Sequence, residues 1–213
     1  MPERCILFST AYFAPIQYYS EFLRADIVYI EQFENFIKQT YRNRCVIPGG
    51  NGPIQLIVPV VKGRGPKILI KDLQISYDTD WQRNHWRTIF SAFSSSPFFE
   101  YYKDDIHPFF QKKHKYLLDF NLQIHETICE LIEIENTAVF TDDFENVPVA
   151  TLNLRESISP KNKMEIDDCF QPMEYTQVFS EKLGFIPNQS ILDLLFNEGP
   201  NSFTILKASF VDS

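Results

Sequence analysis

Short apolar runs and one helical spacing define the first part of the chain. Residues 4–10 (RCILFST) form an apolar run between polar residues, which predicts a buried strand. Pro15 permits a helix to begin, and residues 16–25 are a short helical candidate. A second strand is predicted over residues 26–33 (DIVYIEQF). The order strand, helix, strand is typical of the opening of a parallel α/β unit.

The pattern then alternates with a period of two. Residues 41–47 and 54–61 flank the turn sequence PGGNGP, whose glycines and asparagine suit a backbone with positive φ. This arrangement predicts a hairpin. Residues 67–76 (KILIKDLQIS) predict one further strand.

Helical spacing dominates from Trp81 onward. Residues 81–93 are a helical candidate, and residues 96–112 are a second one that breaks near Pro108. The strongest helix is predicted over residues 114–134. Its apolar positions at helical spacing are Leu117, Phe120, Ile124, Ile128 and Leu131.

The remaining sequence alternates between loop and short elements. Residues 137–144 (TAVFTDDF) predict a strand and a turn, whereas residues 142–174 are acidic and contain three prolines, which predicts a loop region. A short helix is predicted within residues 190–200, with Ser190 as its N-cap and Gly199 just past its end. The expected fold is α/β, with a partly parallel, Rossmann-like sheet flanked by helices and a helical C-terminal half. We expect residues 1–213 to form one domain.

Composition narrows the classes of function. The chain carries 20 Phe and 10 Tyr, which predicts an aromatic core, and its net charge is −8. An acidic protein is a poor non-specific binder of nucleic acid, although residues 1–120 are slightly basic and suit a local anion site. No apolar run is long enough for a membrane span. The four cysteines show no CxxC spacing and no signal peptide is recognised, so a reduced, cytoplasmic protein is expected.

Two arginines in the predicted hairpin are the first candidates for binding. Arg42 and Arg44 are two residues apart, so on a strand they share a face and their guanidiniums suit a phosphate or carboxylate. The alternative is a solvated strand face. Tyr41, Asn43 and Cys45 would point the other way.

The predicted helices hold further polar candidates. Asn121 and His125 fall within the apolar stripe of residues 114–134, so they either tie another segment into the core or line a cleft. Asp193 either completes a capping box with Ser190 or pairs with one of the arginines.

His85 and Arg87 lie near a helix start, where the helix dipole favours an anion. The sequence contains no P-loop, GxSxG or HExxH motif, and no cluster with metal-ligand spacing. No cofactor can be named from these residues.

Taken together, several segments resemble a known family. They are AYFAPIQYYSEFLRADIVYIEQFENFIKQTYRNRCVI, GPIQLIVPVVKG, KILIKDLQIS, HWRTIFSAFSSSPFFEYY, LLDFNLQI and SILDLLFNEGP. This order is similar to the WbqC-like protein family, a bacterial group often found near surface-polysaccharide genes. The resemblance covers about residues 5–206, except for residues 142–174.

The resemblance implies a role in O-antigen or capsule biosynthesis, with aminoacyl or other group transfer. His85 and Asp193 are the expected catalytic residues, while His125 falls outside the family pattern. The expected ligand-binding residues are Tyr18, Arg42, Asn43, Arg44, Arg87, Asn121, Asn197 and Glu198.

Two functional hypotheses follow. The first is a cytoplasmic transferase whose arginine-lined cleft binds a small anionic donor, such as a nucleotide-sugar or an acyl or aminoacyl donor. The alternative is a non-catalytic binding or assembly protein of the same pathway, acting as a homo-oligomer or on a pathway enzyme. An exposed aromatic patch would support the alternative. Its residues would be Phe98, Phe99, Tyr101, Tyr102, Phe109 and Phe110.

Overall fold

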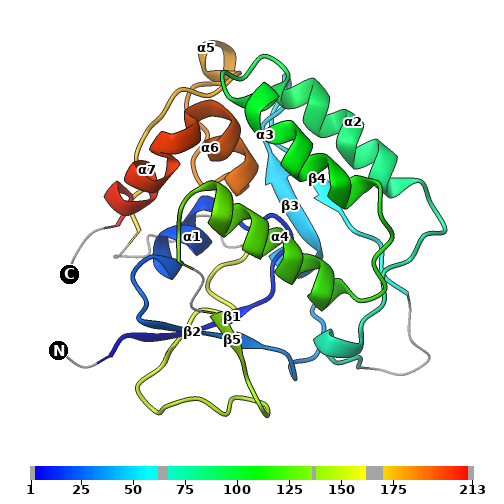
Figure 1. Cartoon of the computed structure of the whole chain (residues 1–213), viewed down its shortest axis with the longest axis vertical. Helices are drawn as coiled ribbons and strands as arrows, with labels where there is room; N and C mark the ends of the chain where they lie inside the picture. Colours follow the sequence, from blue (N-terminus) through cyan, green and yellow to red (C-terminus); the bar gives the residue numbers. More distant parts are fainter. Residues whose placement is uncertain (1–2, 62–66, 136–137, 162–169, 211–213) are drawn as a thin grey trace.

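A four-stranded parallel sheet forms the lower part of the molecule in Figure 1. The computed structural model describes residues 3–61, 67–135, 138–161 and 170–210. The strand order is β5-β2-β1-β6, and each neighbouring pair is parallel. The strands are β1 (Cys5–Ser9), β2 (Ile27–Glu31), β5 (Ala138–Phe140) and β6 (Leu152–Asn153). The expected α/β class with a partly parallel sheet is therefore confirmed.

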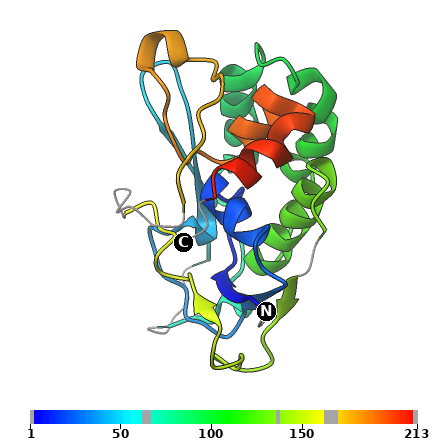
Figure 2. The same ribbon diagram turned by 90° about the vertical axis from the view of Figure 1, so that its left-hand side faces the viewer.

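Helices gather at the opposite end of the molecule from the sheet. Figures 1 and 2 both place α2, α3, α6 and α7 in the upper part, with α1 and α4 between them and the sheet. The helices are α1 (Ile16–Phe22), α2 (Trp81–Phe93), α3 (Phe99–Ile106), α4 (Leu117–Leu131), α5 (Ser180–Leu183), α6 (Ile191–Glu198) and α7 (Ser202–Ala208). The helices of the C-terminal half were expected from the sequence.

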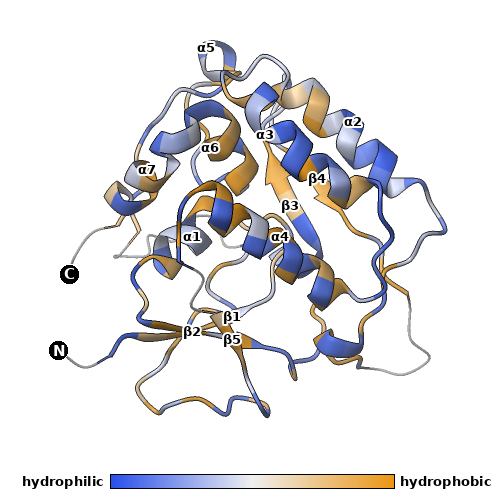
Figure 3. Cartoon of the chain, in the orientation of Figure 1, coloured by the Kyte–Doolittle hydropathy of each residue, from blue (hydrophilic) through white to orange (hydrophobic). Residues whose placement is uncertain are grey.

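The core between these layers is aromatic, as the composition predicts. Every residue of β1 is buried, and most of α6 is buried as well. Figure 3 shows that α6 and β3 are largely hydrophobic, whereas the outer helix α2 carries many hydrophilic residues. The aromatic side chains with almost no exposed surface are Phe8, Tyr12, Phe13, Tyr19, Phe22, Phe93, Phe99, Phe120 and Phe196.

The ends of α6 follow the predicted signals. The Ser190 side chain accepts a hydrogen bond from the backbone N–H of Leu192, so it is the N-cap. Gly199 ends the helix with a φ of 52°. A Cβ there would lie 2.5 Å from the Phe98 ring, so both backbone conformation and space require glycine.

The predicted hairpin forms, but its first strand is shorter than expected. β3 (Arg44–Ile47) pairs antiparallel with β4 (Ile54–Ile57). Residues Tyr41–Asn43 form a 3-10 turn instead of a strand. Arg42 therefore leaves the chain in a different direction from Arg44, and the prediction that the two share a strand face is wrong.

The predicted strand over residues 67–76 is also wrong. Ile70–Asp72 is a 3-10 turn, and the flanking residues make only isolated bridges to other segments. The buried apolar residues Ile70, Leu73 and Ile75 are spaced three and then two apart. A turn that rotates the chain satisfies this spacing, whereas a regular strand does not.

Two further expectations need correction. The region 142–174 contains β6, so part of it belongs to the sheet, and its residues 162–169 lie outside the described residues. The proposed exposed aromatic patch does not form, because Phe99, Phe109 and Phe110 are buried in the core. Tyr101, another member of the expected patch, is exposed.

Candidate functional site

The carboxyl ends of the parallel strands bring distant polar residues together. β1 ends at Ser9, β2 ends at Glu31, and Thr141 directly follows β5. β2 and β5 lie on one side of β1, whereas β6 lies on the other side. In open α/β sheets, ligands bind outside the carboxyl ends at the point where the strand order reverses. The edge between β1 and β6 is that point.

A narrow crevice lies at this point of reversal. Its walls come from the segments that follow β1 and β6, together with α1 and the turn before β3. The lining residues are Phe8, Ser9, Thr10, Ala11, Tyr18, Tyr41, Arg42, Leu154, Arg155 and Ile158. Its cavity volume is about 10 Å³, which is close to the space of one water molecule. A ligand would have to displace side chains in order to enter.

Arg42 forms a bidentate ion pair at the base of the crevice. Its Nε lies 2.7 Å from Glu34 Oε1, and its Nη2 lies 2.6 Å from Glu34 Oε2. Both side chains are buried. Burial works against the charge of Arg42, but the hydrogen bond and charge of Glu34 outweigh it and raise the pKa of the guanidinium. Ser9 Oγ donates a hydrogen bond of 3.3 Å to the same carboxylate.

Glu31 is a second buried carboxylate in this network. It accepts hydrogen bonds from Thr141 Oγ1 at 2.9 Å and from the backbone N–H groups of Phe33 and Glu145 at 2.8 Å. Arg155 Nη1 lies 4.0 Å from its Oε2 atom. These contacts satisfy the buried charge, so the carboxyl ends of β2 and β5 are fixed together.

Two exposed glutamates cover the outer N–H groups of the guanidiniums. Glu156 Oε1 lies 3.2 Å from Arg42 Nη2, and Glu145 Oε1 contacts Arg155 Nη2. Their side chains are 68% and 52% exposed, whereas the carboxylates on the inner side are buried. The inner carboxylates are held rigidly, and the outer ones belong to solvent-facing side chains. An anion that displaced the outer pair would meet two preformed guanidiniums.

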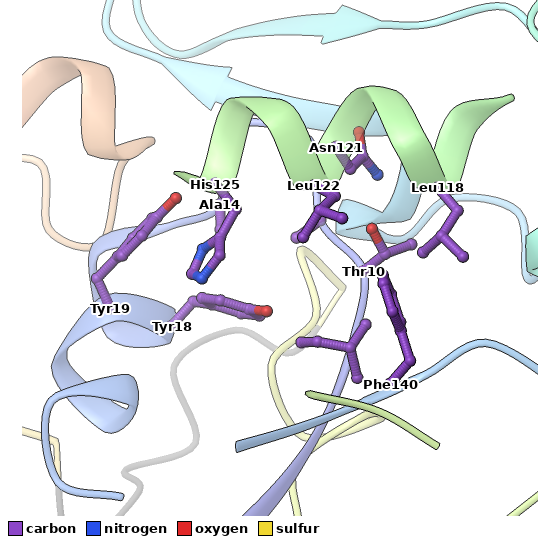
Figure 4. Close-up of a pocket in the computed structure, with 11 residues that line it drawn as sticks. Thr10, Ala14, Tyr18, Tyr19, Leu118, Asn121, Leu122, His125 and Phe140 are labelled. Atoms are coloured by element: carbon purple, nitrogen blue, oxygen red, sulfur yellow. The ribbon is translucent and has the colours of Figure 1, made fainter. Parts of the chain in front are cut away.

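A second cleft adjoins the crevice and contains aromatic and apolar side chains. Figure 4 shows the Tyr18 hydroxyl pointing into the cleft, while Leu122 and His125 reach into it from α4. The cleft has a cavity volume of about 20 Å³. Its lining residues are Thr10, Ala11, Ala14, Tyr18, Tyr19, Ile30, Leu118, Asn121, Leu122, His125 and Phe140. Thr10, Ala11 and Tyr18 line both cavities, so the two are neighbours.

Asn121 connects this cleft to the turn that carries Arg42. Its Nδ2 donates a hydrogen bond of 2.8 Å to the backbone oxygen of Arg42. Its Oδ1 is buried and has no hydrogen-bond partner within the described part of the chain. Both sequence interpretations of Asn121 are therefore met, because it ties a segment into the core and also lines a cleft.

His125 also lines the cleft, packed among side chains of the core. Its ring stacks on Tyr19 with a centroid distance of 5.6 Å, and its Nε2 lies 3.5 Å from the Cys129 sulfur. Burial, with smaller contributions from Glu126 and Glu130, raises the pKa of the Cys129 thiol to about 12. The thiol is therefore not an activated nucleophile.

The two expected catalytic residues lie in neither cavity. His85 is in the second turn of α2 rather than at its start, is buried, and has its Nδ1 3.0 Å from the Tyr12 hydroxyl. Burial lowers its pKa to about 4, so the imidazole is neutral near pH 7. Asp193 lies in the first turn of α6 with no exposed surface. A catalytic role for either residue remains a prediction.

The partners of Asp193 differ from both sequence interpretations. Its Oδ2 accepts hydrogen bonds from the Tyr175 hydroxyl and from Gln177 Nε2, the latter at 2.7 Å, and its Oδ1 accepts one of 3.0 Å from Asn197. No arginine pairs with it among the residues that the structure describes. The capping box is also wrong, because the Ser190 N–H donates to Val46 O instead. Burial raises the pKa of Asp193 to about 6.

Arg42, Arg44 and Arg87 do not line the crevice or the cleft together. Arg42 lies at the crevice, while Arg44 donates a hydrogen bond of 3.0 Å to Gln55 across the hairpin. Arg87 is exposed on α2 and lines a separate surface pocket with Phe179. Arg42 is instead accompanied by Arg155, which the sequence analysis did not select.

The other predicted ligand-binding residues make structural contacts. Asn43 donates a hydrogen bond of 2.8 Å to Val58 O, and Asn197 donates to Asp193. Glu198 accepts a hydrogen bond of 3.0 Å from Asn201. None of these three lines the crevice or the cleft. Ligand binding by them remains a prediction.

Sequence reasoning missed the two buried carboxylates of the network, Glu31 and Glu34, its second guanidinium, Arg155, and the exposed glutamates that cover the guanidiniums. The available signal was the position of charged residues at the end of a predicted buried strand, where the carboxyl edge of a parallel sheet would place them. Arg155 had no such signal, because β6 was hidden in a region read as a loop. No group of three or more potential metal ligands occurs in the described ranges. No helix there has the length and apolar character that a membrane crossing needs.

Comparison with known proteins identifies the family. The WbqC-like protein family matches residues 10–165, which is most of the chain, so the chain belongs to this family. The matched span includes part of the acidic region 142–174, so the exclusion of that whole region from the resemblance was wrong. The Uncharacterized protein Rv1507c of Mycobacterium tuberculosis is 28% identical over 214 residues, covering 88% of this chain and 88% of that protein. No solved structure matches the chain.

Proposed function

We propose that this WbqC-like protein is a transferase of bacterial surface-polysaccharide biosynthesis that binds an anionic donor at the carboxyl edge of its parallel sheet. The family resemblance motivates the pathway, and residues 1–213 would act as one domain. The observation that carries the proposal is the pair of guanidiniums at the crevice, each covered on its outer side by an exposed carboxylate.

The charges explain how an anion could bind there. Arg42 and Arg155 are opposed by two buried carboxylates and by the exposed Glu145 and Glu156. With the exposed carboxylates in place the network has an excess of negative charge, which repels a donor phosphate or carboxylate. When they swing into solvent, the remaining charges balance and the outer N–H groups become available. The donor anion would then take the place of the glutamates.

The buried carboxylates have a positioning role in this scheme. Glu34 holds Arg42 through both oxygens, so little conformational entropy remains to be lost when a ligand binds. Thr10 supplies a hydroxyl group on the β1 side of the crevice, whereas the Ser9 hydroxyl is bonded to Glu34. The anionic group of the substrate would therefore meet hydrogen-bond donors that are already in position.

The alternative is a non-catalytic binding or assembly protein of the same pathway. The aromatic patch expected to support it does not form, since Phe99, Phe109 and Phe110 are buried. The crevice therefore favours the transferase, and the two hypotheses differ in whether a small donor binds at all.

Calorimetric titration with nucleotide-sugars, acyl-coenzyme A and aminoacyl donors tests the proposal. The Glu145→Gln/Glu156→Gln variant should bind the donor about fivefold more tightly than the wild type, since each competing surface ion pair is worth up to ~1 kcal/mol. Arg155→Gln should weaken binding. Glu181→Gln, an exposed glutamate on α5, is the matched control and should change nothing.

Two results would contradict the proposal. One is equal donor affinity in the wild type and the double glutamate variant, which would place the donor elsewhere. The other is the absence of binding by any donor class, together with capture of a pathway protein, which would support the assembly hypothesis.

A further inference from the structure

The cleft beside the crevice has an unusual lining for a site next to an ion network. No Asp, Glu, Lys or Arg side chain contributes to it. Most of its surface is aliphatic or aromatic, from residues such as Leu118, Leu122 and Phe140. An environment of this kind favours an uncharged occupant, because an isolated charge would lose its hydration without gaining a partner.

The polar groups of the cleft are few. The hydroxyls of Thr10 and Tyr18 make no hydrogen bond within the described part of the chain, and Figure 4 shows the Tyr18 hydroxyl pointing inward. Asn121 is almost fully buried and keeps an unpaired Oδ1. The hydroxyls of Thr10 and Tyr18 therefore leave hydrogen-bonding capacity for a ligand, whereas the Asn121 oxygen points away from the cleft in Figure 4.

The size of the cleft limits what can occupy it. A cavity volume of about 20 Å³ is the space of roughly one water molecule, and Leu122, which is only half buried, allows modest widening. A sugar ring is far larger than this space. A group of two or three heavy atoms is compatible with it.

The cleft lies directly beside the proposed anion site, so one ligand can reach both. Thr10, Ala11 and Tyr18 separate it from the crevice and line both cavities. A donor whose anionic part binds at Arg42 and Arg155 would extend its next group past these residues toward the cleft.

We propose that this cleft is the subsite for a small uncharged acyl group, of formyl or acetyl size, carried by the donor. The inference rests on the proposed function, because the crevice must hold the anionic carrier. The hydroxyl of Tyr18 or Thr10 donates to the acyl carbonyl oxygen, and the aliphatic side chains contact the methyl group. Aminoacyl donors fit less well because their ammonium would lack a carboxylate partner, and nucleotide-sugars fit less well because of their size.

Affinity for paired probes tests this subsite. The pairs are acetyl-coenzyme A with coenzyme A, and acetyl phosphate with inorganic phosphate, all measured by calorimetry. In the wild type, the acetylated member should bind about tenfold more tightly in at least one pair, from one buried methyl group and one hydrogen bond. Leu122→Phe should remove that difference and leave the affinity for the unacetylated carrier unchanged. Tyr18→Phe should reduce the difference by severalfold.

Leu131→Phe is the matched control, since Leu131 is a half-buried leucine of the same helix outside the cleft. It should retain the tenfold difference. Equal binding of the two members in both pairs would overturn the subsite while leaving the anion site intact. Binding of nucleotide-sugars but of no acetylated probe would likewise overturn the subsite and leave the anion site intact. Failure of every probe and every donor to bind would overturn both the subsite and the proposed function.

Discussion

Glu34 and Asp193 are both buried carboxylates, but they lie in opposite environments. Glu34 faces Arg42, which contacts both of its oxygens. Within the described residues, Asp193 accepts its side-chain hydrogen bonds from neutral groups, on Tyr175, Gln177 and Asn197. The partner of Glu34 is therefore a compensating charge, whereas the hydrogen-bond partners of Asp193 are neutral dipoles.

The difference separates a candidate site from a structural contact. The Glu34 region borders a crevice and has exposed glutamates, which the proposed donor anion would displace. The Asp193 region borders neither the crevice nor the cleft, and it ties the segment containing Tyr175 and Gln177 to α6. A buried carboxylate alone is therefore weak evidence for catalysis. Access and a displaceable partner are the distinguishing features.

Removal of the charge of Glu34 should have the largest effect on stability. Glu34→Gln leaves Arg42 buried without its bidentate partner, and loss of one member of a buried ion pair costs about 3–5 kcal/mol. We expect this loss in the free energy of unfolding, measured by urea denaturation at pH 7.

The matched control is Glu156→Gln, which removes the exposed partner of the same arginine. Its effect should be below about 1 kcal/mol. Similar effects of the two substitutions would mean that the inner and outer carboxylates are not distinct, and would contradict the comparison.

The sequence predicted the elements whose signals are local. The apolar run 4–10 and the N-cap at Ser190 each depend on neighbouring residues, and both expected elements form. The apolar stripe of α4 likewise placed Asn121 in the interior. Composition and periodicity therefore sufficed for the fold class.

The candidate site depended on contacts between distant residues. Arg42 and Glu156 are 114 positions apart, and no local pattern announces that pair. The 3-10 turn at Tyr41–Asn43 further rotated Arg42 away from the face assigned to it. Tertiary packing overrode the period-two pattern there, and the strand β6 that positions Arg155 has too few residues to give a signal.

The stability effect of Asp193 should depend on pH. Burial raises its folded-state pKa from 3.8 to about 6, so the folded protein binds an extra proton between these values. Its contribution to stability is thus fully present below pH 3.8 and is lost as pH rises through 6. The total change is about 3 kcal/mol. We expect Asp193→Asn to lack this loss.

The titration of His85 has the opposite effect on the pH dependence of stability. Burial lowers its pKa from 6.5 to about 4, so it contributes stability above pH 6.5 that is lost as pH falls through 4. The two effects partly cancel in the wild type. Urea denaturation between pH 4 and 7.5 should therefore show Asp193→Asn losing stability on acidification more steeply than the wild type. Parallel profiles for the two proteins would refute the assignment.

The smallest expected effect comes from one hydrogen bond to Asp193. The Tyr175 hydroxyl donates to the carboxylate and thereby lowers its pKa, against the larger effect of burial. Tyr175→Phe should cost about 1 kcal/mol at pH 7 and much less at pH 4, where the acid is protonated. In this variant the stability contributed by protonated Asp193 should be lost at a pH above 6, because the folded-state pKa of Asp193 rises. Tyr101→Phe, at an exposed tyrosine, is the control and should leave the profile unchanged. An unchanged profile in Tyr175→Phe would mean that the Tyr175 hydrogen bond contributes nothing measurable to the pKa of Asp193.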